Sequence, residues 1–166
     1  MTPRREPVEI ITAGTIRDLA RAAREHPRGR VNLNFHAPED PYQRLLNAVQ
    51  PGSYIRPHRH RAVAKSESFV VLAGEIGLFW FDDAGSVLGA RRLGPEREAR
   101  AVDLAPGVWH SFLALRPDTV VFEAKNGPYD PATDKEFAAW APAEGDPAAG
   151  AYAARLLAAL PADRGS

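Results

Sequence analysis

Apolar positions recur at helical spacing near the start of the chain. Thr15 and Asp18 form a capping signal, and apolar residues then follow three and four apart until the sequence HPRG, residues 26–29. This pattern predicts one amphipathic helix over residues 16–25. Its other face is rich in arginine but also carries acidic residues, which is typical of a solvated helix surface.

Residues 30–129 show short apolar or alternating runs separated by Pro, Gly, Asp and Asn. Nine of these runs are expected to be strands: RVNLNF, RLLNAV, SYIRPH, SFVVLAG, IGLFWF, SVLGARRL, REARAVDL, HSFLAL and TVVFEAK. They recur about every 8–12 residues, with turns such as QPG and DDAG between them, which indicates an antiparallel sandwich or barrel. The run LFWF, residues 78–81, is apolar on both strand faces. One face should fill the barrel, and a terminal helix or a second subunit should cover the other.

The pattern changes again after the last predicted strand. Residues 126–147 are rich in proline and acidic residues, and we expect an ordered loop that wraps the body, with a short helix at Asp134–Ala139. Asp146 and Pro147 resemble the cap and first position of a closing helix that runs to about Leu160. The predicted organisation is an N-terminal helical segment (1–29), a β-barrel (30–129) and a C-terminal loop and helix (130–166).

The composition limits the classes of function. A chain of 166 residues, 45% of them hydrophobic, suits one globular domain, and its zero net charge gives no overall attraction to nucleic acid or anionic membranes. It has no apolar run of membrane-spanning length and no apolar signal-peptide core. We therefore expect a cytoplasmic protein with neither nucleic acid nor a membrane as partner. Because there is no cysteine, any metal must be held by nitrogen and oxygen.

Two of the five histidines lie one residue apart, in RPHRH. Side chains alternate along a strand, so His58 and His60 point to the same face, while Pro57 places this part of the strand at an edge or rim. If that face lies inside a barrel, two imidazoles and the nearby Glu67 carboxylate need compensation, because each unsatisfied buried group costs about 1–3 kcal/mol. A divalent metal would compensate them, and so would an internal hydrogen-bonded network.

A third histidine strengthens the metal interpretation. His110 follows a Pro-Gly turn at the start of another predicted strand, and the series of motifs then resembles the cupin superfamily. The first cupin motif corresponds to Gly52, His58, His60, Glu67 and Gly74, and the second to Pro106, Gly107 and His110. The resemblance implies an all-β, antiparallel jelly-roll barrel with terminal helices. It also implies one divalent transition metal (Zn, Fe, Mn or Ni) bound by His58, His60, His110 and Glu67.

The sequence departs from the cupin pattern around Glu67. Six residues separate His60 from Glu67, a longer gap than the family usually has, and Ala114 replaces a frequent asparagine. A hairpin loop through Arg61–Lys65 can still bring Glu67 to the metal. Its role is therefore open between a metal ligand and a free acid or base.

A narrower resemblance covers most of the strand region and the segment after it. The sequences NFHAPEDPYQRLLNA, YIRPHRH, KSESFVVLAGEIGLFWFDDAG, GVWH and FEAKNGPYDPATDKEFAAWAPAEG look like those of the WbuC-type cupin fold metalloproteins. That resemblance implies an association with bacterial surface-polysaccharide biosynthesis.

Five further residues are candidates for catalysis or substrate binding. His36, Gln43 and Arg44 are substrate-binding candidates, although His36 can be satisfied by local Asn and Asp residues and Arg44 can lie on the surface. Lys65 shares a strand face with Glu67, so it either pairs with that carboxylate, faces the cavity or extends from a loop. Glu123 interrupts the apolar run VVFEAK and is a candidate general base, with an ion pair to Lys125 or an arginine as the alternative.

Three functions fit these features. The first is a metal-dependent isomerase or epimerase acting on a small polar substrate, with Glu67, Glu123 or Lys65 moving the proton. The second is a non-haem iron dioxygenase, for which an apolar pocket would be expected. The residues that we expect to point inward, Phe69, Val71, Phe79 and Phe112, do not exclude such a pocket. The third is a non-catalytic module that binds a metal or small ligand. For each we expect a small-molecule ligand and a homodimer.

Overall fold

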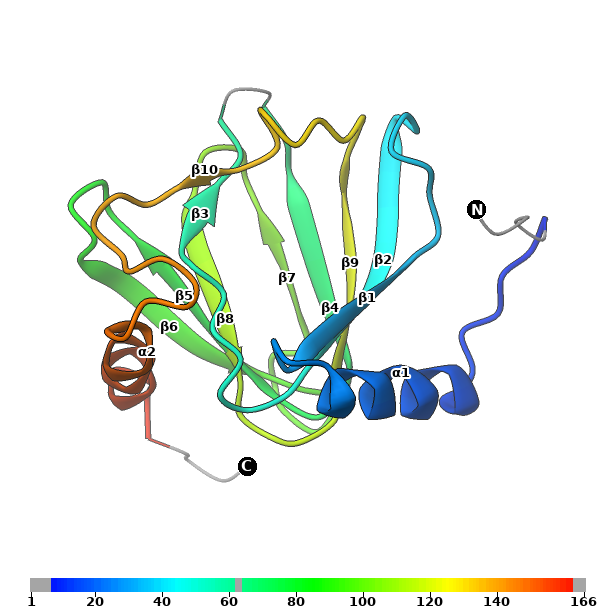
Figure 1. Ribbon diagram of the computed structural model, residues 1–166, viewed down its shortest axis with the longest axis horizontal. Helices are drawn as coiled ribbons and strands as arrows, with labels where there is room; N and C mark the ends of the chain where they lie inside the picture. The colour runs from blue at the N-terminus through cyan, green and yellow to red at the C-terminus, as the bar shows by residue number, and fades with distance from the viewer. Residues whose placement is uncertain (1–6, 62–63, 163–166) are drawn as a thin grey trace.

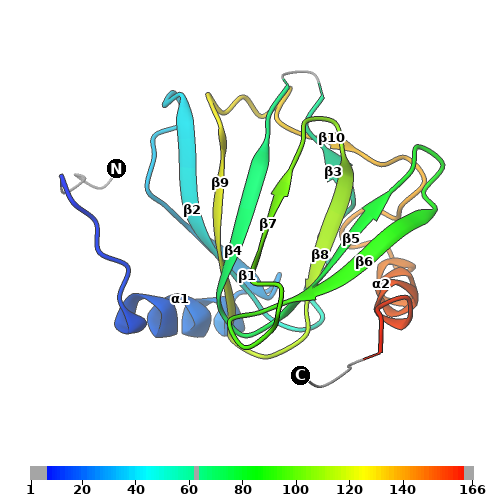
Figure 2. The same ribbon diagram turned by 180° about the vertical axis from the view of Figure 1, so that it is seen from behind.

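The computed structural model describes residues 7–61 and 64–162, which form two antiparallel five-stranded sheets facing each other with a helix near each end (Figures 1 and 2). The first sheet has the order β1 (Arg30–Asn34), β2 (Tyr42–Val49), β9 (Thr119–Asn126), β4 (Glu67–Ala73) and β7 (Ala101–Leu104). The second has the order β10 (Glu136–Phe137), β3 (His58–Arg59), β8 (Trp109–Ala114), β5 (Ile76–Phe81) and β6 (Val87–Leu93). The expected all-β jelly-roll barrel with terminal helices is confirmed. No helix in the described ranges is long and apolar enough to cross a membrane.

Helix α1 (Ala13–Glu25) packs against the outer face of the first sheet. It begins three residues earlier than predicted, because Thr12 rather than Thr15 is the N-cap. Thr12 accepts a hydrogen bond from the backbone N–H of Thr15, and Thr15 accepts one in return, which completes a capping box. Its Ala20 and Ala23 are buried in one cluster with apolar side chains of β2 and β9. The small alanine side chains let the helix lie close to the sheet.

Strand β5 is buried on both faces, as the run LFWF predicts. Ile76, Leu78 and Trp80 pack inside the barrel, whereas Phe79 and Phe81 pack outside it against helix α2 (Ala149–Ala158). The expectation that Phe79 points inward is therefore wrong, because Phe79 lies on the outer face of β5. The terminal helix covers the outer face through Tyr152 and Leu156, which are buried in the same cluster.

The C-terminal part before α2 is also different from its prediction. The residues expected to form a short helix, Asp134–Ala139, instead contain strand β10, which pairs antiparallel with β3. Strand β3 is only two residues long, and residues 53–57 of the predicted strand SYIRPH are irregular, ending in Pro57, which has no N–H for a sheet ladder. The outer edge of β3 has backbone N–H and C=O groups that need hydrogen-bond partners, and β10 pairs with this edge.

The predicted cap of the closing helix is wrong too. Asp146 lies outside α2, where its Oδ1 accepts a hydrogen bond from the N–H of Ala148, and Ala148 is the N-cap without a side-chain hydrogen bond. Residues 127–146, here called the crossing segment, run across the barrel between β9 and α2 (Figure 1). This segment brings polar side chains from late in the chain to the barrel mouth.

Candidate metal centre

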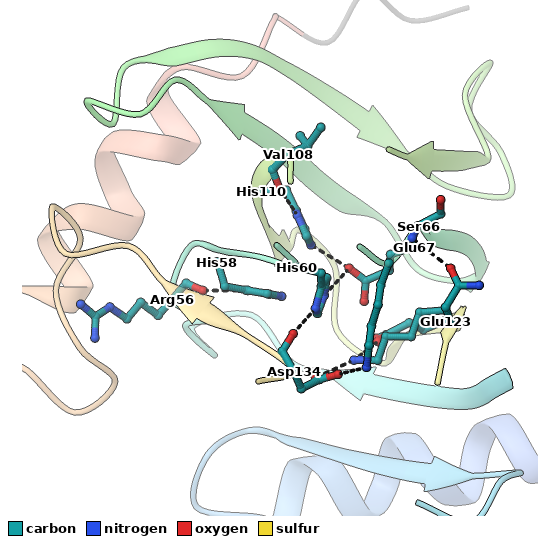
Figure 3. Close-up of polar contacts among 12 residues, drawn as sticks. Arg56, His58, His60, Ser66, Glu67, Val108, His110, Glu123 and Asp134 are labelled. Atoms are coloured by element: carbon teal, nitrogen blue, oxygen red, sulfur yellow. Dashed lines mark hydrogen bonds and ion pairs between the residues drawn. The ribbon is translucent and has the colours of Figure 1, made fainter. Parts of the chain in front are cut away.

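Four buried side chains converge at one end of the barrel (Figure 3). His58 lies on β3 and is paired in register with His110 on the neighbouring strand β8, and His60 follows β3. Glu67 begins β4 in the facing sheet. One potential ligand atom from each of the four lies within 4.8 Å of those of the others. Residues 62–63 of the predicted loop lie outside the described residues, yet the long gap still brings Glu67 to the histidines.

The three imidazoles are oriented in the same way by the backbone. The Nδ1 atom of His58 lies 3.1 Å from the carbonyl oxygen of Arg56, and that of His110 lies 2.9 Å from the carbonyl oxygen of Val108. The Nδ1 atom of His60 contacts the carbonyl oxygen of Asp134 (Figure 3). A carbonyl oxygen only accepts, so each Nδ1 carries a proton, and each neutral ring then offers the lone pair of its Nε2 atom.

The Nε2 atoms of His110 and His60 both face the Glu67 carboxylate. Its Oε2 atom lies 2.8 Å from Nε2 of His110 and 3.2 Å from Nε2 of His60. The contact with His110 is short but is not aligned as a hydrogen bond, and this buried nitrogen has no hydrogen-bond partner. Neutral imidazole and carboxylate are ligands for divalent transition metals, and carbonyl groups that hold the second ring nitrogen are typical of metal-binding histidines. The four residues therefore fit a metal ion.

The electrostatic environment keeps these groups in the forms that bind a cation. Burial lowers the pKa of His58 well below its usual value, with further lowering by Lys135 and His110, so this imidazole is neutral. Burial alone would raise the pKa of Glu67, but interactions with His110 and His60, in the ring forms that carry a proton on Nε2, outweigh burial and hold the pKa of Glu67 well below the usual range. A bound metal ion would take the place of that proton. The carboxylate is therefore ionised.

A second buried polar cluster borders the metal centre. Asp134 forms ion pairs with Lys65 at 2.9 Å and with Lys125 at 3.0 Å, and all three side chains are almost fully buried. Burial would raise the pKa of Asp134, but the two ammonium groups lower it. Lys65 thus binds Asp134 and the carbonyl oxygen of Pro128, rather than Glu67.

Glu123 lies between the two clusters. Burial, together with repulsion by Glu67 and a hydrogen bond with it, raises the pKa of Glu123 to about 8. The Nζ atom of Lys125 lies 3.8 Å from its Oε1 atom, a longer contact than that with Asp134. Its carboxyl group can consequently hold or release a proton near neutral pH.

A pocket of about 780 Å³ opens beside the metal centre and is lined by His58, Glu123 and Lys125. Residues from β1, β2 and the crossing segment also line it: Asn32, Asn34, Gln43, Leu45, Asn47, Tyr129, Pro131, Asp134, Lys135 and Phe137. The other lining residues lie before β1, on β1, after β1, after β2 and near the end of the crossing segment. The volume is within the range of pockets that bind small molecules.

The other candidate substrate residues divide between the two faces of β2. Gln43 and His36 line the pocket, and Nδ1 of His36 accepts a hydrogen bond from the N–H of Arg44. The Arg44 side chain is on the opposite face of β2 from Gln43 and donates to the carbonyl oxygen of Phe35. Sequence reasoning missed Asn32, Asn34, Asn47 and Asp134. The alternate polar positions in VNLN and LLNAV were a signal for the asparagines, whereas Asp134 had no local signal.

Three solved structures that are similar to this chain, those of CapF, oxalate decarboxylase and KdgF, are cupin-fold proteins. The capsular polysaccharide assembling protein CapF from Staphylococcus aureus is 22% identical, with a TM-score of 0.54 over 64% of this chain and 29% of CapF. Oxalate decarboxylase from Bacillus subtilis is 14% identical, with a TM-score of 0.50 over 65% of this chain and 27% of that protein. The chain thus spans less than a third of either protein. KdgF from a Halomonas species is 20% identical, with a TM-score of 0.49 over 61% of this chain and 82% of KdgF. At these identities the likeness to CapF and oxalate decarboxylase shows the fold alone, which is the cupin fold.

Curated proteins give no match to the chain. One family model does match, and it covers residues 11–93, which include α1, the strands from β1 to β6 and three of the four candidate ligands, His58, His60 and Glu67. That family is described as a domain of unknown function (DUF6016). Since the match covers half of the sequence, the chain belongs to the DUF6016 family and has a cupin fold with a candidate metal centre.

Proposed function

We propose that this protein is a metal-dependent enzyme that isomerises or epimerises a small polar substrate of the carbohydrate class. One observation carries the proposal: three imidazoles with the same fixed tautomer and one carboxylate converge beside a polar pocket that also contains Glu123. A metal held by His58, His60, His110 and Glu67 would polarise a carbonyl or hydroxyl oxygen of the substrate.

The residues around the metal centre support proton transfer. The carboxyl group of Glu123 faces the pocket next to Glu67, so its ionised form can take a proton from a substrate carbon and return it to a neighbouring carbon on the same face, as an isomerisation requires. An epimerisation would need a second proton donor on the opposite face of the substrate. Lys125 and Lys65 are both held by Asp134, which favours Glu123 over either lysine as the proton carrier.

The polarity of the pocket distinguishes between the candidate enzymes. Asn32, Asn34, Gln43 and Asn47 line it, whereas the apolar side chains of Phe69, Val71 and Phe112 pack together in the barrel core. A dioxygenase for apolar substrates would be expected to present those apolar side chains to its ligand. The amide-rich lining instead suits a hydroxylated substrate.

We further propose a role in bacterial surface-polysaccharide biosynthesis, in a cytoplasmic homodimer. The sequence resemblance to WbuC-type proteins supports this role. It is consistent with the name of CapF, a capsular polysaccharide assembling protein with the same fold. The cupin fold hosts many reactions, so this part of the proposal rests on association.

Two measurements test the enzymatic proposal. Protein purified without added metal is analysed for transition metals, and is then incubated in D₂O with a panel of aldoses, ketoses and uronic acids while NMR follows deuterium entering carbon positions. We expect stoichiometric metal and deuterium incorporation, which Glu123→Gln abolishes and the exposed-surface variant Glu98→Gln leaves unchanged. Absence of metal uptake, or oxygen consumption in place of exchange, would overturn the proposal.

A further inference from the structure

The inner face of the first sheet carries four amide side chains beside the metal centre. Asn32 and Asn34 lie on β1, Gln43 and Asn47 lie on β2, and all four line the pocket. Asn32 is paired in register with Asn47. Four amides on alternate positions of two adjacent strands form a surface of donors and acceptors without fixed charge.

Two of these amides have polar atoms without a partner. Gln43 is 1% exposed and Asn47 is 8% exposed. The Nε2 donor of Gln43 and the Oδ1 acceptor of Asn47 are buried and make no hydrogen bond within the described protein. Leaving such atoms unsatisfied is unfavourable, so their positions in the wall of the pocket point to a bound molecule with both hydrogen-bond acceptors and donors. Hydroxyl groups supply both.

The charges in the pocket largely compensate each other. Asp134 holds Lys125, and Glu144 holds both Arg28 and Arg30. Among the described lining residues, the exposed Lys135 is the cation outside these ion pairs, and the carboxyl group of Glu123 lies 3.8 Å from the Nζ atom of Lys125. A phosphate group would require several convergent cations, which are already engaged here. The pocket therefore favours a ligand without a phosphate.

The spacing of the two unpartnered amides indicates the size of the ligand. Gln43 and Asn47 are four residues apart on one face of β2, which corresponds to roughly 13 Å along the strand. Leu45 lies between them on the same face and lines the pocket. Gln43 is nearer to the metal centre than Asn47. Lys125 on β9 lies between the two strands, in register with Gln43 on β2 and with the metal-ligand candidate Glu67 on β4. One sugar ring does not span this distance.

We infer that the pocket binds a neutral saccharide of at least two sugar units. The Gln43 amide donates to a hydroxyl or ring oxygen of the unit nearest the metal, and Asn47 accepts from a hydroxyl of the next unit. Leu45 packs against the sugar between these contacts. The orientation of the ligand rests on the proposed function, because the sugar unit that reacts must be the one next to the metal.

Saturation-transfer NMR on the metal-loaded protein tests the ligand class. The probes are the neutral disaccharides maltose, cellobiose, lactose and N,N′-diacetylchitobiose, with glucose and glucose 1-phosphate for comparison. We expect at least one disaccharide to bind more tightly than both comparison compounds. Binding of no disaccharide, or tighter binding of glucose 1-phosphate, would overturn the inference.

Two variants test the residues. Gln43→Leu and Asn47→Leu should each weaken disaccharide binding about tenfold, since each removes one hydrogen bond to the ligand. Tyr42→Phe is the matched control, because Tyr42 is on the same strand but is exposed on its other face. Unchanged affinity in both leucine variants would contradict the assignment.

Stability separates a binding role from a structural one. Because Nε2 of Gln43 and Oδ1 of Asn47 are buried without a protein partner, leucine at either position should keep or raise the urea midpoint of unfolding. A lowered midpoint in both variants would show that the amides stabilise the fold instead.

Metal content and deuterium exchange are measured on the same samples. Metal binding and exchange without disaccharide binding would overturn this inference alone, and disaccharide binding without metal would overturn the proposed function alone.

Discussion

The imidazole of His60 contacts the backbone carbonyl oxygen of Asp134, a residue 74 positions later in the chain. The Asp134 carboxylate in turn holds Lys65 from the start of the β4 region and Lys125 from β9. The crossing segment is therefore fastened to both sheets at the point where it orients a candidate metal ligand. Four predictions follow from this arrangement and from features elsewhere in the fold.

Asp134→Asn should reduce the free energy of unfolding by about 3–5 kcal/mol. The substitution leaves the buried ammonium group of Lys65 without its anionic partner and leaves Lys125 with only the more distant carboxyl group of Glu123, 3.8 Å away, and breaking a buried ion pair has a cost of this size. Urea denaturation measures the change. Asp130→Asn, in the exposed part of the same segment, is the control and should alter stability by less than about 0.5 kcal/mol. Equal losses in the two variants would refute the role of the ion pairs.

His58→Ala and His110→Ala should abolish stoichiometric metal binding while the far-UV circular dichroism spectrum stays close to that of the parent protein. Each variant removes one imidazole from the four-residue cluster but leaves the barrel core intact. His36→Ala is the control, because His36 lines the same pocket outside the cluster. Elemental analysis and zinc titration measure the outcome. Full metal retention by both variants would show that the ligand set is wrong.

Gly74→Ala should destabilise the protein more than Gly52→Ala. Both glycines have positive φ values, 74° and 88°, so that alanine costs about 1–2 kcal/mol at either position. At Gly74 an added Cβ would also meet the backbone Cα of Thr119 at 2.7 Å, whereas nothing lies within 4 Å at Gly52. Crowding should add about 1–3 kcal/mol at Gly74. Equal urea midpoints for the two variants would exclude that extra cost.

Alkaline conditions should weaken the contact between α2 and the barrel. Burial raises the pKa of Tyr152 to about 12, above the value of about 10 for an unfolded tyrosine. A group with a raised folded-state pKa contributes stability below its unfolded pKa, and this contribution falls as the pH rises from about 10 to 12. Phenolate absorbance at 295 nm should thus lag in the folded protein relative to the urea-unfolded chain. Tyr152→Phe should shrink the lag, and the exposed variant Tyr42→Phe should preserve it.

Much of the barrel was predictable because strand spacing and turn residues are local signals. Run IGLFWF coincides with β5, and TVVFEAK is extended by only one residue in β9. The motif histidines were also visible in the sequence, and the fold brings them together with Glu67. Local patterns are sufficient where an element is long or a motif is compact.

The predictions failed where tertiary contacts outweigh local preference. The sequence DKEFAA has good helix formers, yet the unpaired edge of β3 draws residues 136–137 into a strand. Phe79 was assigned to the wrong face, because a strand that is apolar on both faces has no alternation to read. The contact between His60 and Asp134 joins segments far apart in the chain, and nothing near either residue indicates it.

The orienting partners of all three imidazoles are main-chain carbonyl groups. A side-chain substitution does not remove a main-chain acceptor, so substitutions outside the histidines leave the three tautomers unchanged. The three acceptors differ in how firmly the chain holds them. His58 and His110 take their acceptors from two residues upstream on the same stretch of backbone, whereas His60 depends on a loop that evolution or an engineer can lengthen, shorten or replace. A change in the length of the loop that carries Asp134 can therefore alter the orientation of His60 while all four candidate metal ligands stay the same.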